Sequence, residues 1–180
     1  MIVGNSLAAG AAVIVASDHP DRVTGLVLVG PFVRNPPANA VMLGLFRVMM
    51  APLWIASVWK AYMPTLYAGR KPVDFDDYRA SVIASLRRPP YGTAFSLTTR
   101  QTDHAPAEAR LCGVKVPALV IMGERDPDFT HPAAEAKRIG ETLHAEVMMV
   151  AEAGHYPQPQ QPDITTGAVL GFLKTVLHDA

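Results

Sequence analysis

The chain has 180 residues, which is enough for one domain with a substantial hydrophobic core. Its 16 basic and 16 acidic side chains cancel to a formal net charge of zero, so no charge imbalance favours nucleic acid as a partner. The single cysteine, Cys112, excludes a disulfide framework and a cysteine-based metal site. We expect a cytoplasmic protein, because a lone thiol suits a reducing compartment.

The first elements alternate between strand and helix. Residues 1–3 predict a short strand, and residues 6–17 predict a helix that is apolar on all sides and therefore buried. Residues 23–29 read V-T-G-L-V-L-V, a β-branched run that is typical of a buried strand and ends at Gly30. The N-terminus lacks the positive charge and long apolar run of a signal peptide.

Residues 32–111 have a different character. Met, Trp, Tyr and Pro are frequent there, and apolar residues follow helical spacing. One predicted helix has Asp74 and Asp76 at its start and Arg87 at its end, an order of charges that suits the helix dipole. We interpret this section as an inserted helical cap.

An apolar stretch from residue 41 to residue 67 raises the question of a membrane span. A span needs about 20 predominantly apolar residues, with few or no charges. Arg47 and Lys60 interrupt the stretch, as do two prolines. We therefore expect no membrane partner.

Strands return after the cap. Residues 116–122 (V-P-A-L-V-I-M) and residues 145–150 predict two further strands, with a helix from Pro132 to Leu143 between them. A last helix begins near Pro162 and carries apolar residues at helical spacing, which predicts one face toward the core: Ile164, Ala168, Phe172, Leu173, Val176 and Leu177. Strands that alternate with helices predict an α/β fold with a parallel sheet and right-handed crossovers.

Three residues with catalytic side chains each follow a predicted strand. Ser6 lies in V-G-N-S-L-A-A-G, Asp126 in M-G-E-R-D-P-D, and His155 in A-E-A-G-H-Y-P. Sites in open parallel sheets form at the carboxyl ends of the strands. We therefore expect these side chains to lie at one edge of the sheet.

The chain order of Ser6, Asp126 and His155 resembles the triad of the α/β-hydrolase superfamily, and the segment from Val3 to Gly10 resembles its nucleophile elbow. The resemblance implies a hydrolase core in residues 1–31 and 112–180 and a helical cap in residues 32–111. It also implies that the parallel sheet begins at the elbow strand, so that the chain corresponds to the C-terminal part of the fold.

The triad roles follow from the chemistry of acyl transfer. A serine hydroxyl needs an adjacent base, so His155 is expected to take the proton of Ser6 and return it to the leaving group. Asp126 is expected to accept the other ring N–H of His155 and to stabilise the imidazolium. The backbone N–H of Leu7, the residue after the nucleophile, is the expected oxyanion donor.

Each residue of the expected triad also has an alternative interpretation in which its role is structural and not catalytic. Ser6 could be the N-cap of an apolar helix, and Asp126 could be a turn residue before a proline. His155 could be an ordinary loop histidine. Asp128 and Glu124 are rival acids, although the G-x-x-D spacing from Gly123 favours Asp126.

The sequence lacks the motifs of metal, phosphate and dinucleotide sites. The sequence contains no H-E-x-x-H metal motif, no phosphate-binding loop and no dinucleotide glycine pattern, so we expect neither a metal nor a cofactor.

A serine at the elbow favours a small-molecule substrate with an ester, thioester or lactone, or a carbon–carbon bond next to a ketone. An acyltransferase activity is a further alternative. Trp54, Phe46 and Trp59 of the cap are candidate contacts to an apolar substrate, and the alternative is that they pack the cap onto the core.

The position of the elbow near Met1 carries a further expectation. In the family, earlier strands and a loop that supplies a second oxyanion donor precede the elbow, so we expect a fragment of a longer hydrolase. The elbow strand is then expected at an open sheet edge, where self-association is possible. The alternative function is an inactive remnant or a non-enzymatic interaction domain that retains the fold.

Overall fold

The computed structural model describes residues 1–37 and 39–178. These residues divide into two compact units. The first unit comprises Met1–Asn35, Leu66–Lys71 and His104–Ala180, and the second comprises Pro36–Thr65 and Pro72–Asp103. The second unit is therefore narrower than the cap of residues 32–111 that the sequence predicts, and it is interrupted by a short segment of the first unit.

The first unit contains a parallel sheet of four strands, β1 (Ile2–Asn5), β2 (Leu26–Val29), β3 (Ala118–Gly123) and β4 (Glu146–Val150), in that order across the sheet. In the register, Asn5 lies beside Val29 and Val29 lies beside Ile121. The carboxyl ends of neighbouring strands are thus aligned. The prediction of an α/β fold with a parallel sheet is confirmed.

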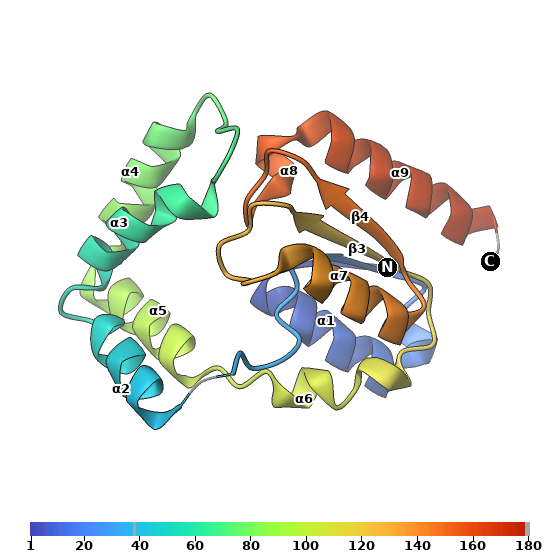
Figure 1. Cartoon of the computed structure of the whole chain (residues 1–180), viewed down its shortest axis with the longest axis horizontal. Helices are drawn as coiled ribbons and strands as arrows, with labels where there is room; N and C mark the ends of the chain where they lie inside the picture. The colour runs from blue at the N-terminus through green and yellow to red at the C-terminus, as the bar shows by residue number, and fades with distance from the viewer. Residues whose placement is uncertain (38, 179–180) are drawn as a thin grey trace. The chain divides into compact units, whose positions relative to one another are not determined.

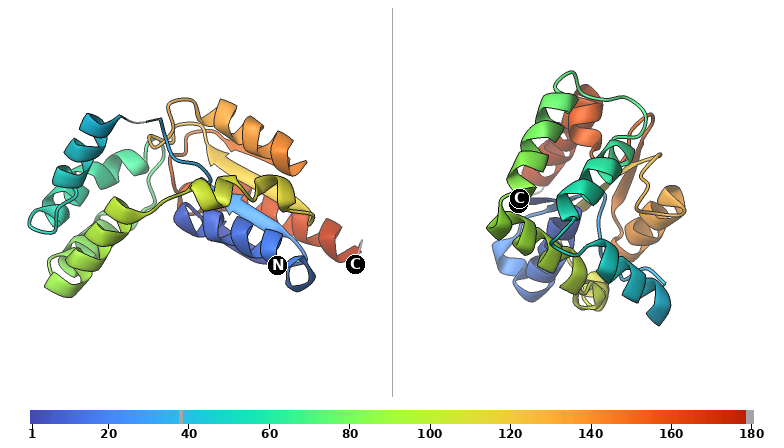
Figure 2. Two further views of the ribbon diagram at one scale, coloured as in Figure 1. Left: turned by 90° about the horizontal axis from the view of Figure 1, so that it is seen from below. Right: turned by 90° about the vertical axis from the view of Figure 1, so that its left-hand side faces the viewer.

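Helices cover both faces of this sheet, and Figures 1 and 2 show the sheet between α7 and α9. The helical elements of the first unit are α1 (Leu7–Asp18), η1 (Pro20–Arg22), α6 (Ala105–Glu108), η2 (Leu111–Gly113), α7 (Pro132–Leu143), α8 (Pro157–Gln160) and α9 (Pro162–His178). Helix α7 begins and ends where the sequence predicts it.

Alternating residues of the two central strands build two hydrophobic cores. Leu28 and Val120 lie in a cluster with residues of α1 and α7. Val29 and Ile121 lie in a second cluster with Phe172 of α9. All residues of β2 and β3 are buried, as expected for strands that are covered on both faces.

Helix α1 differs from its prediction. The sequence predicts burial on all sides, but Leu7 is 39% exposed and Val15 is 40% exposed. Among the described residues, β1 is the edge strand of the sheet and pairs with β2 alone. Helix α1 packs against β1, β2, α6 and η2, and these contacts leave Leu7 and Val15 partly exposed. Val3 of β1 is 58% exposed at the same edge.

The second unit is helical and has its own buried residues. It comprises α2 (Ala40–Met49), α3 (Ile55–Leu66, whose last residue belongs to the first unit), α4 (Phe75–Leu86) and α5 (Pro89–Gln101). Ile55, Met63 and Ile83 are buried within it. In the described part of the chain, no helix combines the length and the apolar composition that crossing a membrane requires.

A charged cluster anchors the chain after β2 to helix α7. Arg34 Nε donates to Glu135 Oε1 at 3.0 Å, and Arg138 donates to the same carboxylate at 2.8 Å. Burial raises the pKa of Glu135, but the hydrogen bonds from Arg34 and Arg138 outweigh burial, and the net effect lowers its pKa.

We expect Glu135→Gln to lower the free energy of unfolding by about 1–3 kcal/mol, because hydrogen bonds from two guanidinium groups to a charged acceptor are weakened. A lowered pKa means that this contribution is present above the ordinary pKa of a glutamate and is lost as pH falls through the lowered value. Urea unfolding of both proteins at several pH values measures the difference. A difference that grows toward acid pH would contradict this assignment.

Self-association through β1 stays a prediction that the open edge allows us to test. Val3→Lys places a charge on the exposed edge strand, which should oppose strand pairing between copies. Light scattering coupled to size exclusion, over a range of protein concentrations, should show a smaller mean mass for the variant. A wild-type chain that is monomeric throughout would reject the prediction.

Candidate active site

The site begins at the tight turn between β1 and α1. Ser6 has φ 58° and ψ −122°, a left-handed backbone conformation that is uncommon for a residue other than glycine. Two backbone bonds hold the turn: the Ser6 N–H donates to Val29 O at 2.9 Å, and the Phe32 N–H donates to Ser6 O at 3.2 Å. A Cβ atom at Gly4 would lie 2.7 Å from Ala8 O, so the turn requires a glycine there.

The side chain of Ser6 does not cap the helix that follows. It occupies the N-cap position of α1 but makes no capping hydrogen bond, and its φ is far from the extended values of ordinary N-cap residues. The N-cap alternative therefore has no support in the geometry. The hydroxyl is left available for another role.

Asp126 and His155 meet at the carboxyl ends of β3 and β4. His155 Nδ1 lies 2.7 Å from Asp126 Oδ2, and each residue is only 2% exposed. A carboxylate can only accept, so the Nδ1–H of His155 donates in this pair. The other oxygen, Asp126 Oδ1, accepts the backbone N–H of Asp128 at 3.0 Å. These bonds fix the carboxylate and orient the imidazole.

The two rival acids are placed less favourably. Asp128 Oδ2 lies 3.5 Å from His155 Nδ1, and its side chain is 20% exposed. Glu124 is exposed. One potential metal-ligand atom from each of Asp126, Asp128 and His155 lies within 4.8 Å of the other two. The hydrogen bonds within this group explain its closeness without an ion.

Asn5 links the serine turn to the histidine loop. Its side-chain Nδ2 donates to Val29 O at 3.0 Å and to His155 O at 3.4 Å. Ser6 Oγ makes no hydrogen bond to His155 among the residues that the structure describes. Such bonds are often long before substrate binds, and the strand ends bring both residues to one edge of the sheet.

A comparison with models of protein families identifies the family of this chain. The model described as "Alpha/beta hydrolase family" matches residues 1–168. The chain belongs to the alpha/beta hydrolase family. The resemblance that the elbow and the Ser-Asp-His order suggest is thereby confirmed at the level of the family and its fold.

Two curated relatives align with this chain over nearly its whole length. A 2-hydroxy-6-oxononadienedioate/2-hydroxy-6-oxononatrienedioate hydrolase of Dechloromonas aromatica is 30% identical, over 96% of this chain and 61% of its own length. A hydrolase of the same name from Burkholderia vietnamiensis is 25% identical, over 96% of this chain and 62% of its own length. The chain thus spans about three fifths of the length of these relatives.

Solved structures share the fold. An esterase of Thermogutta terrifontis superposes with a TM-score of 0.66 at 23% identity, over 97% of this chain and 64% of the esterase. A bromoperoxidase of Bacillus anthracis superposes with a TM-score of 0.73 at 17% identity, over 96% of this chain and 66% of its own. At these identities the likeness concerns the alpha/beta hydrolase fold alone.

Two residues of the candidate site are missed by the sequence patterns. Phe32, which the sequence assigns to the cap, stacks on the ring of His155 with centroids 5.2 Å apart. Gly30 has φ 49°, and a Cβ atom there would lie 3.1 Å from the His155 ring and 3.3 Å from Asp126 Oδ2. A G-P-F sequence after a strand indicates a chain turn, but it does not reveal that the turn packs on His155 and Asp126.

The remaining predicted site residues are Leu7 and three aromatic residues, and they differ in their contacts and exposure. Leu7 is the first residue of α1, where the helix dipole favours negative charge. Trp54 Nε1 donates to Val48 O and Met49 O at the end of α2, and Trp59 packs against Phe95 with ring centroids 4.7 Å apart. Phe46 is exposed. Contact of Phe46, Trp54 and Trp59 with substrate stays a prediction.

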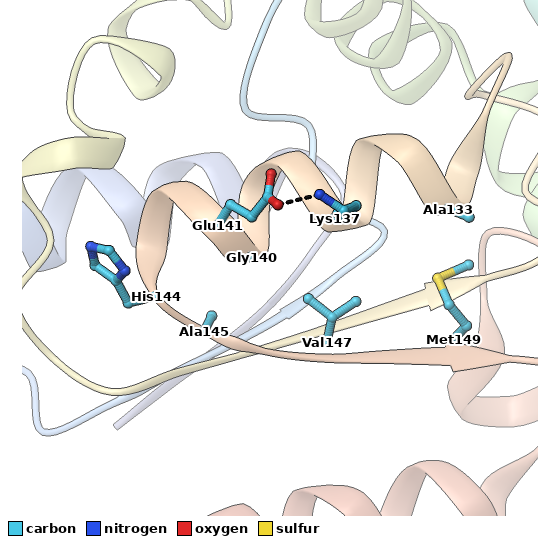
Figure 3. Close-up of a pocket in the computed structure, with 8 residues that line it drawn as sticks. All are labelled: Ala133, Lys137, Gly140, Glu141, His144, Ala145, Val147 and Met149. Atoms are coloured by element: carbon cyan, nitrogen blue, oxygen red, sulfur yellow. Dashed lines mark hydrogen bonds and ion pairs between the residues drawn. The ribbon is translucent and has the colours of Figure 1, made fainter.

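A shallow groove of 360 Å³ lies between α7 and β4 (Figure 3). Val147 and Met149 of β4 point toward it, and Lys137 and Glu141 of α7 form an ion pair along its side. None of Ser6, Asp126 and His155 lines it. The groove therefore offers no support for ligand binding at these three residues.

We expect Gly30→Ala to lower the free energy of unfolding by about 1–3 kcal/mol, since the new Cβ meets the His155 ring and the backbone is left-handed. Gly167→Ala is the matched control, because it lies within α9 with nothing within 4 Å of its Cβ. Helix propensity predicts that the control gains up to about 1 kcal/mol. Equal unfolding midpoints for both variants would show that Gly30 does not confine the histidine.

Proposed function

We propose that this chain is a serine hydrolase that acts on an ester or a similar acyl bond of a small apolar substrate and needs no cofactor. The observation that carries the proposal is the buried hydrogen bond of 2.7 Å between His155 and Asp126 at the sheet edge that also holds the Ser6 turn. Family membership and the hydrolase names of the relatives support it.

The proposed reaction proceeds in two steps. Ser6 Oγ attacks the acyl carbon while His155 Nε2 takes its proton, and His155 then returns the proton to the leaving group. A water molecule, activated by the same nitrogen, hydrolyses the acyl-serine. Asp126 holds the Nδ1–H of His155 in both steps, which keeps Nε2 free to accept and stabilises the imidazolium.

The backbone at the start of α1 supports the same chemistry. The left-handed turn sets Ser6 directly before a helix N-terminus, where backbone N–H groups and the dipole favour an anion. We assign the N–H of Leu7 to the developing oxyanion. A side chain in the place of Gly4 would disturb this turn, because it would meet the backbone of Ala8.

The names of the two curated relatives suggest a second class of substrate. Both are named as hydrolases of 2-hydroxy-6-oxo dienedioates and trienedioates. Compounds of this kind contain no ester, so a carbon–carbon bond beside the 6-oxo group is the candidate bond. The same three residues suit that cleavage, which makes a 2-hydroxy-6-oxo dienedioate the second substrate to test.

A non-enzymatic domain that retains the fold is the alternative function. The observation that favours it is that Ser6 Oγ makes no hydrogen bond to His155 among the described residues. In that case the buried pair of His155 and Asp126 would serve only to hold two loops together.

The test combines labelling with turnover. We expect a fluorophosphonate probe to label the wild-type chain at Ser6, and we expect Ser6→Ala to lose both the label and hydrolysis of p-nitrophenyl butyrate. Removal of a nucleophile that acts together with its base lowers kcat by several orders of magnitude. Intact-protein mass spectrometry and a colorimetric assay measure the two effects.

Ser81→Ala is the matched control, because Ser81 is an exposed serine on α4. The control should keep both the label and the rate. Equal rates for wild type and Ser6→Ala on the ester and on the dienedioate, together with an unlabelled wild type, would reject the proposal and favour the non-enzymatic domain.

A further inference from the structure

A buried glutamine lies five residues after the histidine. Gln160 ends the short helix α8 and is only 1% exposed. A primary amide has two donor hydrogens and one acceptor oxygen, so its burial requires partners for all three. In the structure each of the three has a partner.

These partners lie on two different segments of backbone. Gln160 Oε1 accepts the N–H of Gly154 at 2.9 Å, in the loop that carries His155. Gln160 Nε2 donates to Ala68 O at 3.0 Å and to Arg70 O at 2.6 Å. The amide therefore joins the histidine loop to residues 66–71, which we name the strap.

The strap also contacts the histidine loop directly. The N–H of His155 donates to Leu66 O at 2.8 Å, and the N–H of Arg70 donates to Glu152 O at 2.9 Å. Gly69 has φ 86°, and a Cβ atom there would lie 2.3 Å from Glu152 O. The two segments are thus packed backbone against backbone.

The loop that carries His155 contains a strained backbone conformation. Glu152 has φ 54°, a left-handed conformation that a glutamate adopts only when its surroundings enforce it. The strap holds the loop in this conformation through two hydrogen bonds. The carbonyl of Glu152, before Ala153, accepts from the strap, and the N–H of His155, after Gly154, donates to it. An apolar side chain at position 160 would remove all three of these bonds and would leave the N–H of the buried Gly154 without its partner.

We propose that Gln160 is a positioning residue for His155: by pairing the strap with the histidine loop, its amide sets the place of the imidazole against Asp126 and the Ser6 turn. The inference deepens the proposed function and rests on it. Misplacement of a catalytic group by about 1 Å can lower a rate by two orders of magnitude. Gln160 thereby acts on the reaction without contact to substrate.

The test uses three variants of the full chain. Gln160→Met removes the amide at similar size. Gly69→Ala disturbs the strap independently, through its backbone conformation and the contact to Glu152 O. Gln158→Met is the matched control, because Gln158 lies in the same helix and its Oε1 has no hydrogen-bond partner among the residues that the structure describes. Circular dichroism establishes that each variant folds.

Two readouts need no turnover. Hydrogen exchange followed by mass spectrometry should show faster exchange in residues 66–71 and 151–156 for Gln160→Met and Gly69→Ala. Proton NMR of histidine-labelled protein should show the low-field Nδ1–H signal of His155 shifted or lost in both. The control should match wild type in each measurement.

The third readout is kinetic. We expect kcat of Gln160→Met to fall by roughly ten- to a hundredfold while KM stays within about twofold, since transition-state geometry changes and substrate binding does not. Wild-type exchange and an unchanged His155 signal in both strap variants would overturn the inference. A wild-type chain without turnover would overturn the proposed function instead, and the exchange and NMR results would still decide whether Gln160 positions His155.

Discussion

The hydrogen bond between His155 and Asp126 is the interaction around which the rest of the site is arranged. Both side chains are almost fully shielded from water, so neither could replace its partner with solvent if the bond were broken. Gly30 leaves room for the pair, and Phe32 stacks on the imidazole. The neighbouring backbone is thus shaped to the pair.

Much of this arrangement is encoded in short stretches of sequence. A run such as V-P-A-L-V-I-M is long enough and apolar enough to predict a central strand, which the structure has at Ala118–Gly123. Parallel strands with helical crossovers bring their carboxyl ends to one edge. The positions of Ser6, Asp126 and His155 at that edge therefore follow from local pattern and topology alone.

What the sequence does not reveal depends on contacts between distant segments. The apolar spacing of α9 predicts Ile164 and Leu177 on its core face, yet these residues are 45% and 72% exposed, because only part of the helix packs on the sheet. Gln160 has an ordinary local context, P-Q-P-Q, and its burial depends on carbonyls some 90 residues earlier. No spacing rule connects those positions, so the strap lies unrecognised inside the predicted cap.

The position of the strap in the chain has a consequence for how this protein can change over evolution. A second unit made from one insertion would join the first unit at two points, whereas the strap divides the second unit into two insertions with four junctions. An exchange of residues 36–103 as a single cassette would also replace the segment whose backbone carbonyls accept hydrogen bonds from His155 and Gln160. The two insertions can diverge in length and composition separately, but the six residues between them must keep their backbone geometry.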